Sequence, residues 1–340
     1  MTMPVTRTEG NPPAAEPQTF LRPIEVELRQ IEEVLAAELD SVVQTVAAVS
    51  NHILEAGGKR LRPSLVALSA RACRENPHSE HVVNMGACVE LIHMATLMHD
   101  DVIDGAEFRR GRTTANSCWG NQISVLTGDY MLAKAFSLLA RDGDVRVMEA
   151  ISLATISMTE GEISQIESRG DTNALVAYYL SVIHDKTAAF MSACCRVGAI
   201  LAGAPSQDED ALARYGMNLG MAFQITDDLL DLVGEPAITG KPIGGDIRES
   251  KVTMPLILAL EKAKPADRAA LESMIQGDGV STADIEFARK LAEDTGAVQA
   301  TREAASRYIE QGIEDLAPLP ASEARASLKA LARFVLHRRS

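Results

Sequence analysis

Several features that would assign a chain to a common class are absent from this sequence. Its cysteines form no Cys-X-X-Cys pair, which disfavours a zinc site or a redox motif, and we expect them to be reduced core residues. They are Cys73, Cys88, Cys118, Cys194 and Cys195. A net charge of -14 lacks the basic excess that nucleic-acid binding requires, so we expect no nucleic-acid partner. No convincing run alternates as a strand would, which leaves an all-α fold.

Long apolar runs are missing as well. The longest, from Ala188 to Ala204, contains Arg196 and is shorter than a usual membrane-spanning helix. Residues 1–18 are rich in Pro, Thr, Glu and Ala, and they lack the charged start and apolar core of a signal peptide. We therefore expect a cytoplasmic protein, with a disordered tail at residues 1–20 and one helical domain at residues 21–340.

Two copies of an acidic pentapeptide are the most informative feature that is present, at residues 100–104 and 227–231. Each copy begins with two aspartates and ends with a third, inside an apolar run typical of a helix. Carboxylates four residues apart share one face of a helix, where their repulsion costs stability. Cations would offset this cost, and Mg²⁺ typically takes one or two carboxylates together with waters and phosphates. Two such helices facing each other would form a cleft for a diphosphate.

Flanking residues extend both acidic stripes. The run from Val82 to Met98 is almost wholly apolar, yet it contains His93, which lies eleven residues before Asp104 and therefore on the same helical face. In the second run Gln224 lies seven residues before Asp231, again on the face of the aspartates. Either motif alone is also consistent with an acidic helix end or a solvated surface run. The repetition in the same apolar context favours a cation site.

Basic residues stand where a phosphate would need them. Lys59 and Arg62 lie on a short loop after a helical stretch that begins near Pro23, with Gly57 as its stop and Pro63 opening the next helix. The arginine fork suits phosphate oxygens, although a solvated basic loop would have the same composition. A further cation, in the pair Lys186–Thr187, interrupts an apolar helical run, where a lysine is costly unless it is paired or lines a cavity. The other basic residues near the two motifs are Arg109, Arg110, Arg112, Lys241 and Lys251.

Taken together, these segments resemble the trans-isoprenyl diphosphate synthases, also called polyprenyl synthetases. The similarity extends from about residue 22 to residue 338. Two positions depart from the family's pattern, since Ser250 stands where glycine is usual and Gly245 where asparagine is frequent. The matching segments are Gly57–Pro63, Leu91–Asp104, Arg109–Gly111, Trp119–Asn121, Gly128–Tyr130, Lys186–Thr187, Phe223–Asp231 and Gly240–Pro255, followed by the tail from Leu319 to Val335.

The resemblance implies a single large helical bundle around a central apolar cavity, and an Mg²⁺-dependent condensation of an allylic diphosphate with isopentenyl diphosphate. It assigns Mg²⁺ ions to Asp100, Asp104 and Asp227. It assigns the orientation of water and neighbouring groups to Asp101, Asp228 and Asp231. The allylic diphosphate would be bound by Arg109, Lys186 and Lys241, and isopentenyl diphosphate by Lys59, Arg62, His93 and Arg110, with Lys251 as a further substrate-binding residue. The allylic cation would be faced by Thr187 and Gln224.

The resemblance implies that product length depends on residues one turn before the first motif. Ala95 and Thr96 are small, where family members with short products carry aromatic residues that block the growing tail. A helical turn rises roughly 5.4 Å, which is similar to an extended isoprene unit. The tail would continue toward Met131 and Ala135 on a neighbouring helix. We expect a product of about C40 to C50, with about C15 to C20 as the alternative.

The resemblance also implies a homodimer that has no transmembrane segment and touches a membrane peripherally when it releases product. A long product would serve as a quinone side chain.

Two rival functions belong to other classes. A class I terpene cyclase also ionises an allylic diphosphate with Mg²⁺, but it has no second substrate for the loop of Lys59 and Arg62 to bind. A non-catalytic subunit of a heteromeric synthase is free to lose aspartates, whereas this chain keeps all six. Consumption of isopentenyl diphosphate in proportion to product distinguishes a synthase from both.

Overall fold

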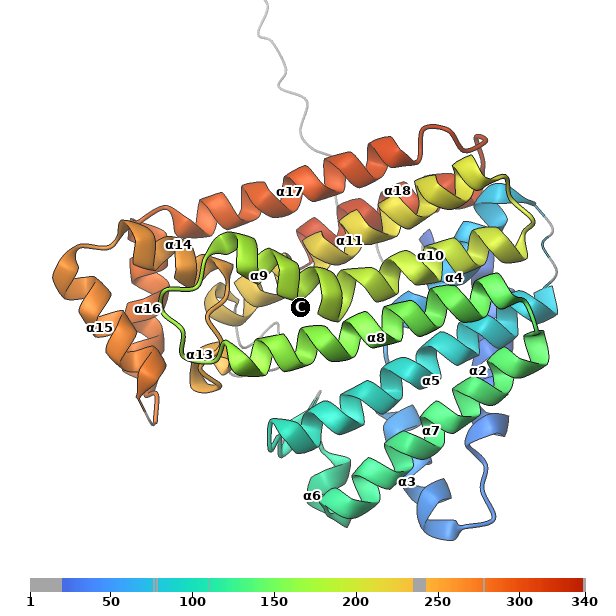
Figure 1. Cartoon of the computed structure of the whole chain (residues 1–340), viewed down its shortest axis with the longest axis horizontal. Helices are drawn as coiled ribbons and strands as arrows, with labels where there is room; N and C mark the ends of the chain where they lie inside the picture. Colours follow the sequence, from blue (N-terminus) through green and yellow to red (C-terminus); the bar gives the residue numbers. More distant parts are fainter. Residues whose placement is uncertain are drawn as a thin grey trace, which may run out of the picture.

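A computed structural model describes residues 20–75, 77, 79–109, 111–234, 243–277 and 279–338. The tail expected at residues 1–20 lies outside these ranges except for its last residue. Long helices account for nearly all of the regular structure and run side by side across the molecule (Figure 1). The expected all-α fold is therefore confirmed. Within those ranges the only strands are β1 (Phe108–Arg109) and β2 (Arg112–Thr113), which pair antiparallel.

The helices follow one another with short connections. The N-terminal half contains η1 (Arg22–Ile24), α2 (Glu25–Leu39), α3 (Gln44–Glu55), α4 (Leu61–Cys73), α5 (Ser79–Ile103), α6 (Ala115–Trp119), α7 (Asn121–Asp142) and α8 (Val145–Glu167). The middle contains α9 (Val176–Ile183), the π-helical turn η2 (His184–Ala188), α10 (Ala189–Leu201), α11 (Ser206–Val233) and α13 (Gly245–Arg248). The C-terminal part contains α14 (Met254–Lys262), α15 (Pro265–Gln276), α16 (Thr282–Asp294), α17 (Ala297–Asp315) and α18 (Glu323–His337).

The core forms around α5 and α10, which are apolar on most sides and therefore lie inside the bundle. α5 packs against α2, α4 and α7, and α10 packs against α4, α8 and α11. Leu91 and Ile92 on α5 and Phe190 on α10 have no exposed surface. A smaller apolar cluster joins α14, α15 and α16 to the end of α11, at the left of Figure 1. The two acidic motifs thus end helices that are anchored in the main core.

The helical stretch expected from Pro23 to Gly57 is interrupted, so that part of the prediction is wrong. α2 ends at Leu39, and the chain is extended at Asp40 before α3 begins. The Ser41 hydroxyl accepts a hydrogen bond from the backbone N–H of Val43 (3.2 Å). Such local bonds from serine compete with helical hydrogen bonding, which explains the break.

The stop after α3 agrees with the sequence. Gly57 has φ of 66°, a left-handed conformation that glycine adopts at the end of a helix. α4 begins at Leu61, so Pro63 lies inside its first turn instead of opening it. Arg60, just before α4, is also left-handed, with φ of 45°.

The cysteines are free, as expected, but they do not all belong to the core. Cys88, Cys194 and Cys195 are buried, whereas Cys118 is exposed. Cys118 lies on the short helix α6, which buries only Ala115. The expectation of a core position is therefore wrong for Cys118.

Two helices, α5 and α7, are long and apolar enough to cross a membrane by length and composition. Within the most apolar part of α5, 72% is buried inside the protein, as in the core helix of a soluble domain. The corresponding share of α7 is 39%, so much of its apolar surface is left uncovered by the rest of the described chain.

Candidate active site

The first acidic motif lies at the C-terminal end of α5, where its three aspartates face different neighbours. Asp101 is buried, and its Oδ1 accepts a hydrogen bond from Nε of Arg109 on β1 (2.6 Å). Asp104 accepts from Nη2 of Arg169 (2.6 Å) with Oδ1, while Nζ of Lys251 lies 3.6 Å from Oδ2. Arg109 therefore pairs with Asp101. The resemblance implied that it binds the allylic diphosphate.

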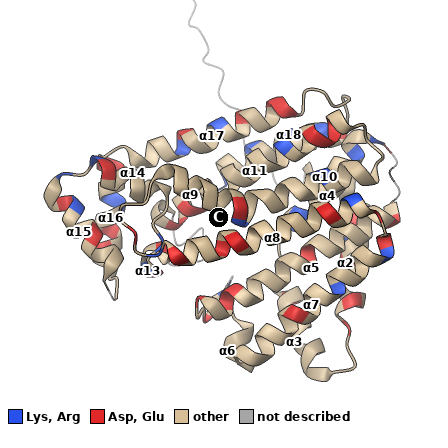
Figure 2. Ribbon diagram, viewed as in Figure 1, with Lys and Arg blue, Asp and Glu red and all other residues tan. Residues whose placement is uncertain are grey.

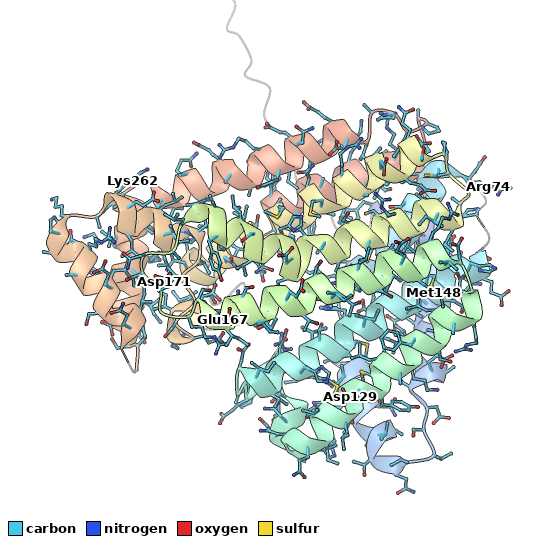
Figure 3. The ribbon with its side chains drawn as sticks, viewed as in Figure 1. Arg74, Asp129, Met148, Glu167, Asp171 and Lys262 are labelled. Atoms are coloured by element: carbon cyan, nitrogen blue, oxygen red, sulfur yellow. The ribbon has the colours of Figure 1, made fainter. Side chains whose placement is uncertain are left out.

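Arg169 follows α8, in the connection to α9. Glu167 and Asp171, on either side of it, lie at the left end of α8 and in the loop beyond (Figure 3). Acidic residues recur along this part of α8 (Figure 2). An open cavity of about 620 Å³ adjoins this end of the motif, lined by Asp104, Arg169, Gly170, Arg248, Glu249, Ser250, Ile275 and Gln276.

Asp100 is held in an environment that disfavours its negative charge. Burial raises the pKa of Asp100 to about 6, an effect that the charge of Lys186 only partly offsets and that Glu162 increases. A carboxylate in this position gains from a neighbouring cation.

The second motif, on α11, repeats this arrangement. Burial also raises the pKa of Asp228 to about 6, despite its hydrogen bonds from Tyr179 and Gln224. Asp231 accepts hydrogen bonds from the backbone N–H groups of Gly245 (3.2 Å, to Oδ1) and Asp246 (2.9 Å, to Oδ2). Burial nevertheless raises the pKa of Asp231, because these two bonds do not fully compensate it.

Asp227 has a partner from the far end of the chain. Nη2 of Arg338 donates to Asp227 Oδ1 (3.1 Å) and to the backbone oxygen of Phe223 (2.9 Å). The Arg338 guanidinium also lies over the Phe223 ring, 4.0 Å from its centroid. Burial lowers the pKa of Arg338, although Asp227 acts in the opposite direction.

The π-helical turn η2 connects the two motifs. Nζ of Lys186 donates to Gln165 Oε1 on α8 (2.7 Å) and pairs with Glu162, on the side of Asp100. The Thr187 hydroxyl donates to Gln224 Oε1 on α11 (2.9 Å). A single turn therefore presents one residue to each motif.

Two glycines allow η2 to approach its neighbours this closely. A Cβ at Gly161 on α8 would lie 2.5 Å from the backbone nitrogen of Lys186, and one at Gly220 on α11 would lie 2.5 Å from Cα of Ala188. Both distances are far shorter than van der Waals contact, and the obstructing atoms are backbone. The turn is clamped from both sides by helices that can carry no side chain at these points.

Lys251 forms a second connection between the motifs. It pairs with Glu249 and lies beside Asp104, and burial alone would lower its pKa, but these carboxylates raise it. Asp246 lies next to Asp231, and its pKa is raised well above the usual range, by burial first and then by the charge of Asp231. Lys251 also acts on Asp246, so one lysine is shared by the two ends of the site.

A small cavity of about 40 Å³ lies between α5, the end of α3 and the strands β1 and β2. Arg60 lines this cavity and bonds to two glutamates. Its Nε donates to Glu32 Oε1 (2.6 Å), and its Nη1 donates to Glu90 Oε1 (2.9 Å). The lining residues that bear on function are Gly57, Arg60, Glu90, His93, Asp101, Arg109 and Arg112.

Lys59 and Arg62 are not among the residues that line this cavity. Nζ of Lys59 lies 5.7 Å from the centroid of the Phe334 ring on α18, and the Arg62 guanidinium lies 5.9 Å from that of Phe190 on α10. The structure thus brings His93 together with Arg109 and Arg112, and turns Lys59 toward the helix that ends near Arg338.

The remaining site predictions have different outcomes. Arg110 and Lys241 lie outside the described residues. Ala95 is fully buried, and the Thr96 hydroxyl donates to the backbone oxygen of His93 (2.9 Å). Ser250, where the family usually has glycine, has φ of 55°, a left-handed conformation that explains the family's preference.

Sequence reasoning missed four residues with direct contacts to the site: Tyr179, Glu162, Arg169 and Arg338. Tyr179 stands in an apolar run that predicts only core packing, and Arg338 follows the last helix, where basic residues are common. Glu162 had one usable signal, since it lies three residues before Gln165 on the same helical face of α8.

The donor set fits a hard divalent cation. Asp100, Asp104 and Asp227 offer carboxylate oxygens, the ligands that Mg²⁺ prefers, and burial, which raises the pKa of Asp100, disfavours an uncompensated negative charge there. Among the described residues, no three His, Cys, Asp or Glu side chains lie together as a metal cage. Mg²⁺ usually completes such sets with waters and phosphate oxygens.

Comparison with known proteins agrees with this arrangement. The family model described as polyprenyl synthetase matches residues 43–292. The chain is 36% identical to an all-trans-nonaprenyl-diphosphate synthase (geranyl-diphosphate specific) of Rhodobacter capsulatus, over 94% of this chain and 98% of that one. It is also 36% identical to a short chain isoprenyl diphosphate synthase of Methanothermobacter thermautotrophicus, over 88% and 92%. A polyprenyl synthase of Caulobacter crescentus, solved with calcium and isoprenyl diphosphate, superposes with a TM-score of 0.92 at 36% identity, over 96% of this chain and 99% of that one.

The fold and the site define an all-α enzyme in which carboxylates at the ends of α5 and α11 meet basic side chains from other segments. The chain belongs to the polyprenyl synthetase family. The resemblance read from the sequence and the class of enzyme, a transferase, are both confirmed.

We predict that cation binding depends on pH through Asp100. Its raised pKa means that the folded protein retains a proton that the unfolded chain has lost between about pH 4 and pH 6, so this group's contribution to stability declines as pH rises through about 6. A cation reverses that loss. Mg²⁺ with pyrophosphate should therefore raise Tm more near pH 8 than near pH 5.

Thermal unfolding of wild type, Asp100→Asn and Asp294→Asn measures this effect, and Asp294 is an exposed control on α16. Asp294→Asn should behave as wild type, and Asp100→Asn should lose most of the gain near pH 8. An equal gain at both pH values in wild type would contradict the assignment.

Proposed function

We propose that the protein condenses an allylic diphosphate with successive molecules of isopentenyl diphosphate, with Mg²⁺, to give a long all-trans polyprenyl diphosphate. The observation that carries the proposal is the link through η2, where Lys186 lies toward the first aspartate motif and Thr187 bonds to Gln224 beside the second. A diphosphate between the motifs would meet carboxylate-bound cations and a lysine at once.

The allylic diphosphate would be bound across α5 and α11. Asp100, Asp104 and Asp227 would hold Mg²⁺, which would supply positive charge to stabilise the negative charge that develops on the leaving diphosphate. Lys186 and Lys251 add positive charge from η2 and from the segment after α13. Because this charge is greatest as the C–O bond breaks, these residues stabilise the transition state more than the ground state. Lys241 belongs to the same set of expected ligands.

Arg109 and the aspartates Asp101, Asp228 and Asp231 would act around this centre. Arg109 bonds to Asp101, so it fixes that carboxylate and neutralises it while its remaining N–H groups stay available for the diphosphate. Asp231 receives two backbone N–H bonds and holds the Gly245–Asp246 segment against the second motif. These contacts support positioning roles for the three aspartates.

The allylic cation would be stabilised by oxygen atoms and shielded from water. The Thr187 hydroxyl and the Gln224 carbonyl are hydrogen-bonded to each other at the junction of the two motifs, which supports their assignment to this task. Apolar helices below them exclude water.

Isopentenyl diphosphate would lie beside the allylic substrate, with Lys59, Arg62, His93 and Arg110 binding its diphosphate. The cavity that contains His93 and adjoins Arg109 and Arg112 supports one end of this pocket. The contact of Lys59 with Phe334, on the helix that leads to Arg338, supports an approach from the other end. Attack of the isopentenyl double bond on the allylic carbon forms the new bond as the allylic C–O bond breaks and pyrophosphate leaves. Transfer of a proton to the departed pyrophosphate then yields an allylic diphosphate one unit longer.

The product would be about C40 to C50, formed without obstruction by the small residues Ala95 and Thr96. Relatives of equal identity include a nonaprenyl and a short-chain synthase, so overall similarity does not decide the length. The small side chains of Ala95 and Thr96 favour the longer product. Met131 and Ala135 on α7 are fully buried next to α5, in line with a tail that grows between these helices. Such a product would serve as a quinone side chain and leave through a peripheral membrane contact.

A homodimer would form through α7 and α8. The two consecutive helices leave large apolar side chains exposed, at Leu126 and Phe136 on α7 and at Leu153, Ile156 and Ile163 on α8. The last three recur at the spacing of one helical face. A second copy of the chain would cover this surface. A cytoplasmic location and a domain that spans residues 21–340 complete the proposal.

Incubation of the purified protein with geranyl diphosphate, isopentenyl diphosphate and Mg²⁺ tests the proposal. Wild type should consume several molecules of isopentenyl diphosphate for each product chain, and Asp227→Asn should lower turnover by at least about 100-fold because a cation ligand is lost. Asp294→Asn is the matched control. Allylic diphosphate consumed without isopentenyl diphosphate would instead indicate a cyclase, and no consumption by a folded wild type would indicate a non-catalytic subunit.

Ala95→Phe should shorten the product to about C15 to C20 while leaving the first condensation intact, because the aromatic ring fills the path beneath the first motif. Thr96→Phe should act in the same direction. Chromatography of dephosphorylated products measures the length, with Ala37→Phe, at an exposed position of α2, as the control. An unchanged length in Ala95→Phe would rule out this path.

Leu153→Glu should convert the dimer to a monomer, since a charge replaces an apolar contact at the centre of the proposed interface. Light scattering after size-exclusion chromatography gives the mass. Val26→Glu, at an apolar position of α2 with similar exposure, should leave the dimer intact. A wild-type monomer, or a Leu153→Glu dimer, would contradict the assignment.

A further inference from the structure

The buried hydroxyl of Tyr179 is part of a hydrogen-bond chain that ends at Gln224 and Thr187. The Tyr179 hydroxyl donates to Asp228 Oδ2 (2.6 Å), and Nε2 of Gln224 donates to the other oxygen of the same carboxylate (2.7 Å). The Thr187 hydroxyl donates to Gln224 Oε1 (2.9 Å). Tyr179 and Asp228 are both buried, with 6% and 7% of their surface exposed. This hydrogen-bond chain joins three elements, α9, η2 and α11.

The hydrogen-bond chain determines which way the Gln224 amide points. An ionised carboxylate only accepts hydrogen bonds, so the amide must turn its NH₂ group toward Asp228 and its carbonyl oxygen toward Thr187. The reverse orientation would place NH₂ hydrogens, which carry partial positive charge, where the proposed function needs an electron-rich oxygen.

Tyr179 keeps the carboxylate in the position that this orientation requires. Both oxygens of Asp228 are engaged, so rotation of the carboxylate away from Gln224 would break a buried hydrogen bond to a charged group. Without the hydroxyl, Oδ2 loses that donor and the carboxylate is free to turn.

We propose that Tyr179 is a positioning residue for the prenyl-transfer reaction, which acts through Asp228 to hold the Gln224 carbonyl toward the allylic carbon. This inference rests on the proposed function. Tyr179 touches no reacting atom in this account. Its effect should therefore appear in the rate of the chemical step and depend on the presence of Gln224.

Tyr179→Phe removes the hydroxyl and keeps the ring. Tyr215→Phe is the matched control, because the Tyr215 hydroxyl is also fully buried and donates to a backbone oxygen, that of Leu328 (2.7 Å), away from the site. We expect Tyr179→Phe to lower kcat by about 10- to 100-fold, with KM for both diphosphates within about two-fold of wild type. Tyr215→Phe should change kcat by less than about three-fold.

A double-mutant cycle with Gln224→Leu separates positioning from general support of the fold. In the Gln224→Leu protein, Tyr179→Phe should cost less than about three-fold in kcat, since the group it positions is gone. The same full loss in both backgrounds, a loss no larger than in Tyr215→Phe, or a rise in KM with unchanged kcat would overturn the proposal.

The same four proteins, unfolded by denaturant, test the hydrogen-bond chain without reference to activity. The stability losses of Tyr179→Phe and Gln224→Leu should be non-additive, because both act on Asp228. If these losses are non-additive but the protein consumes no isopentenyl diphosphate, the proposed function is wrong and the hydrogen-bond chain is right. If the losses are additive, the hydrogen-bond chain itself is wrong.

Discussion

Aspartates buried at the ends of two core helices create a deficit of positive charge, and the arrangement of the whole site follows from it. Burial raises the pKa of Asp100 and Asp228, so the folded chain alone does not fully satisfy them. At two other aspartates of the motifs, basic residues from distant segments form ion pairs: Arg169 pairs with Asp104, and Arg338 pairs with Asp227. Cations that arrive with a diphosphate would complete the compensation.

The helical bundle supplies the rigid geometry that such compensation needs. The turn η2 is a π-helix packed between a glycine of α8 and a glycine of α11. Its adjacent residues Lys186 and Thr187 therefore face opposite motifs. π-Helical turns within longer helices are frequent at functional sites, because the extra residue reorients side chains without ending the helix. Here the neighbours Gly161 and Gly220 fix the turn between α8 and α11.

The sequence predicted what depends on local spacing. Apolar runs predicted helices where most of α5 and the C-terminal part of α11 lie, and the spacing of the repeated aspartates was enough to identify the candidate site. Contacts between distant residues were out of reach: Tyr179 lies 49 residues from Asp228, and Arg338 lies 111 residues from Asp227. Nothing in an apolar run marks one tyrosine as a carboxylate partner. The break near Asp40 was missed because the competing bond from Ser41 is a local detail within a continuous helical pattern.

The central claim is that the two motifs bind cations and a diphosphate as one unit. Calorimetric titration of Mg²⁺ into the protein, with and without a non-reactive allylic thiodiphosphate, measures that coupling directly. The account predicts weak Mg²⁺ binding alone, binding at least about ten-fold tighter with the diphosphate, and loss of the difference in both Asp100→Asn and Asp227→Asn. Equal Mg²⁺ affinity with and without the diphosphate, or a difference that survives in either variant, would contradict it.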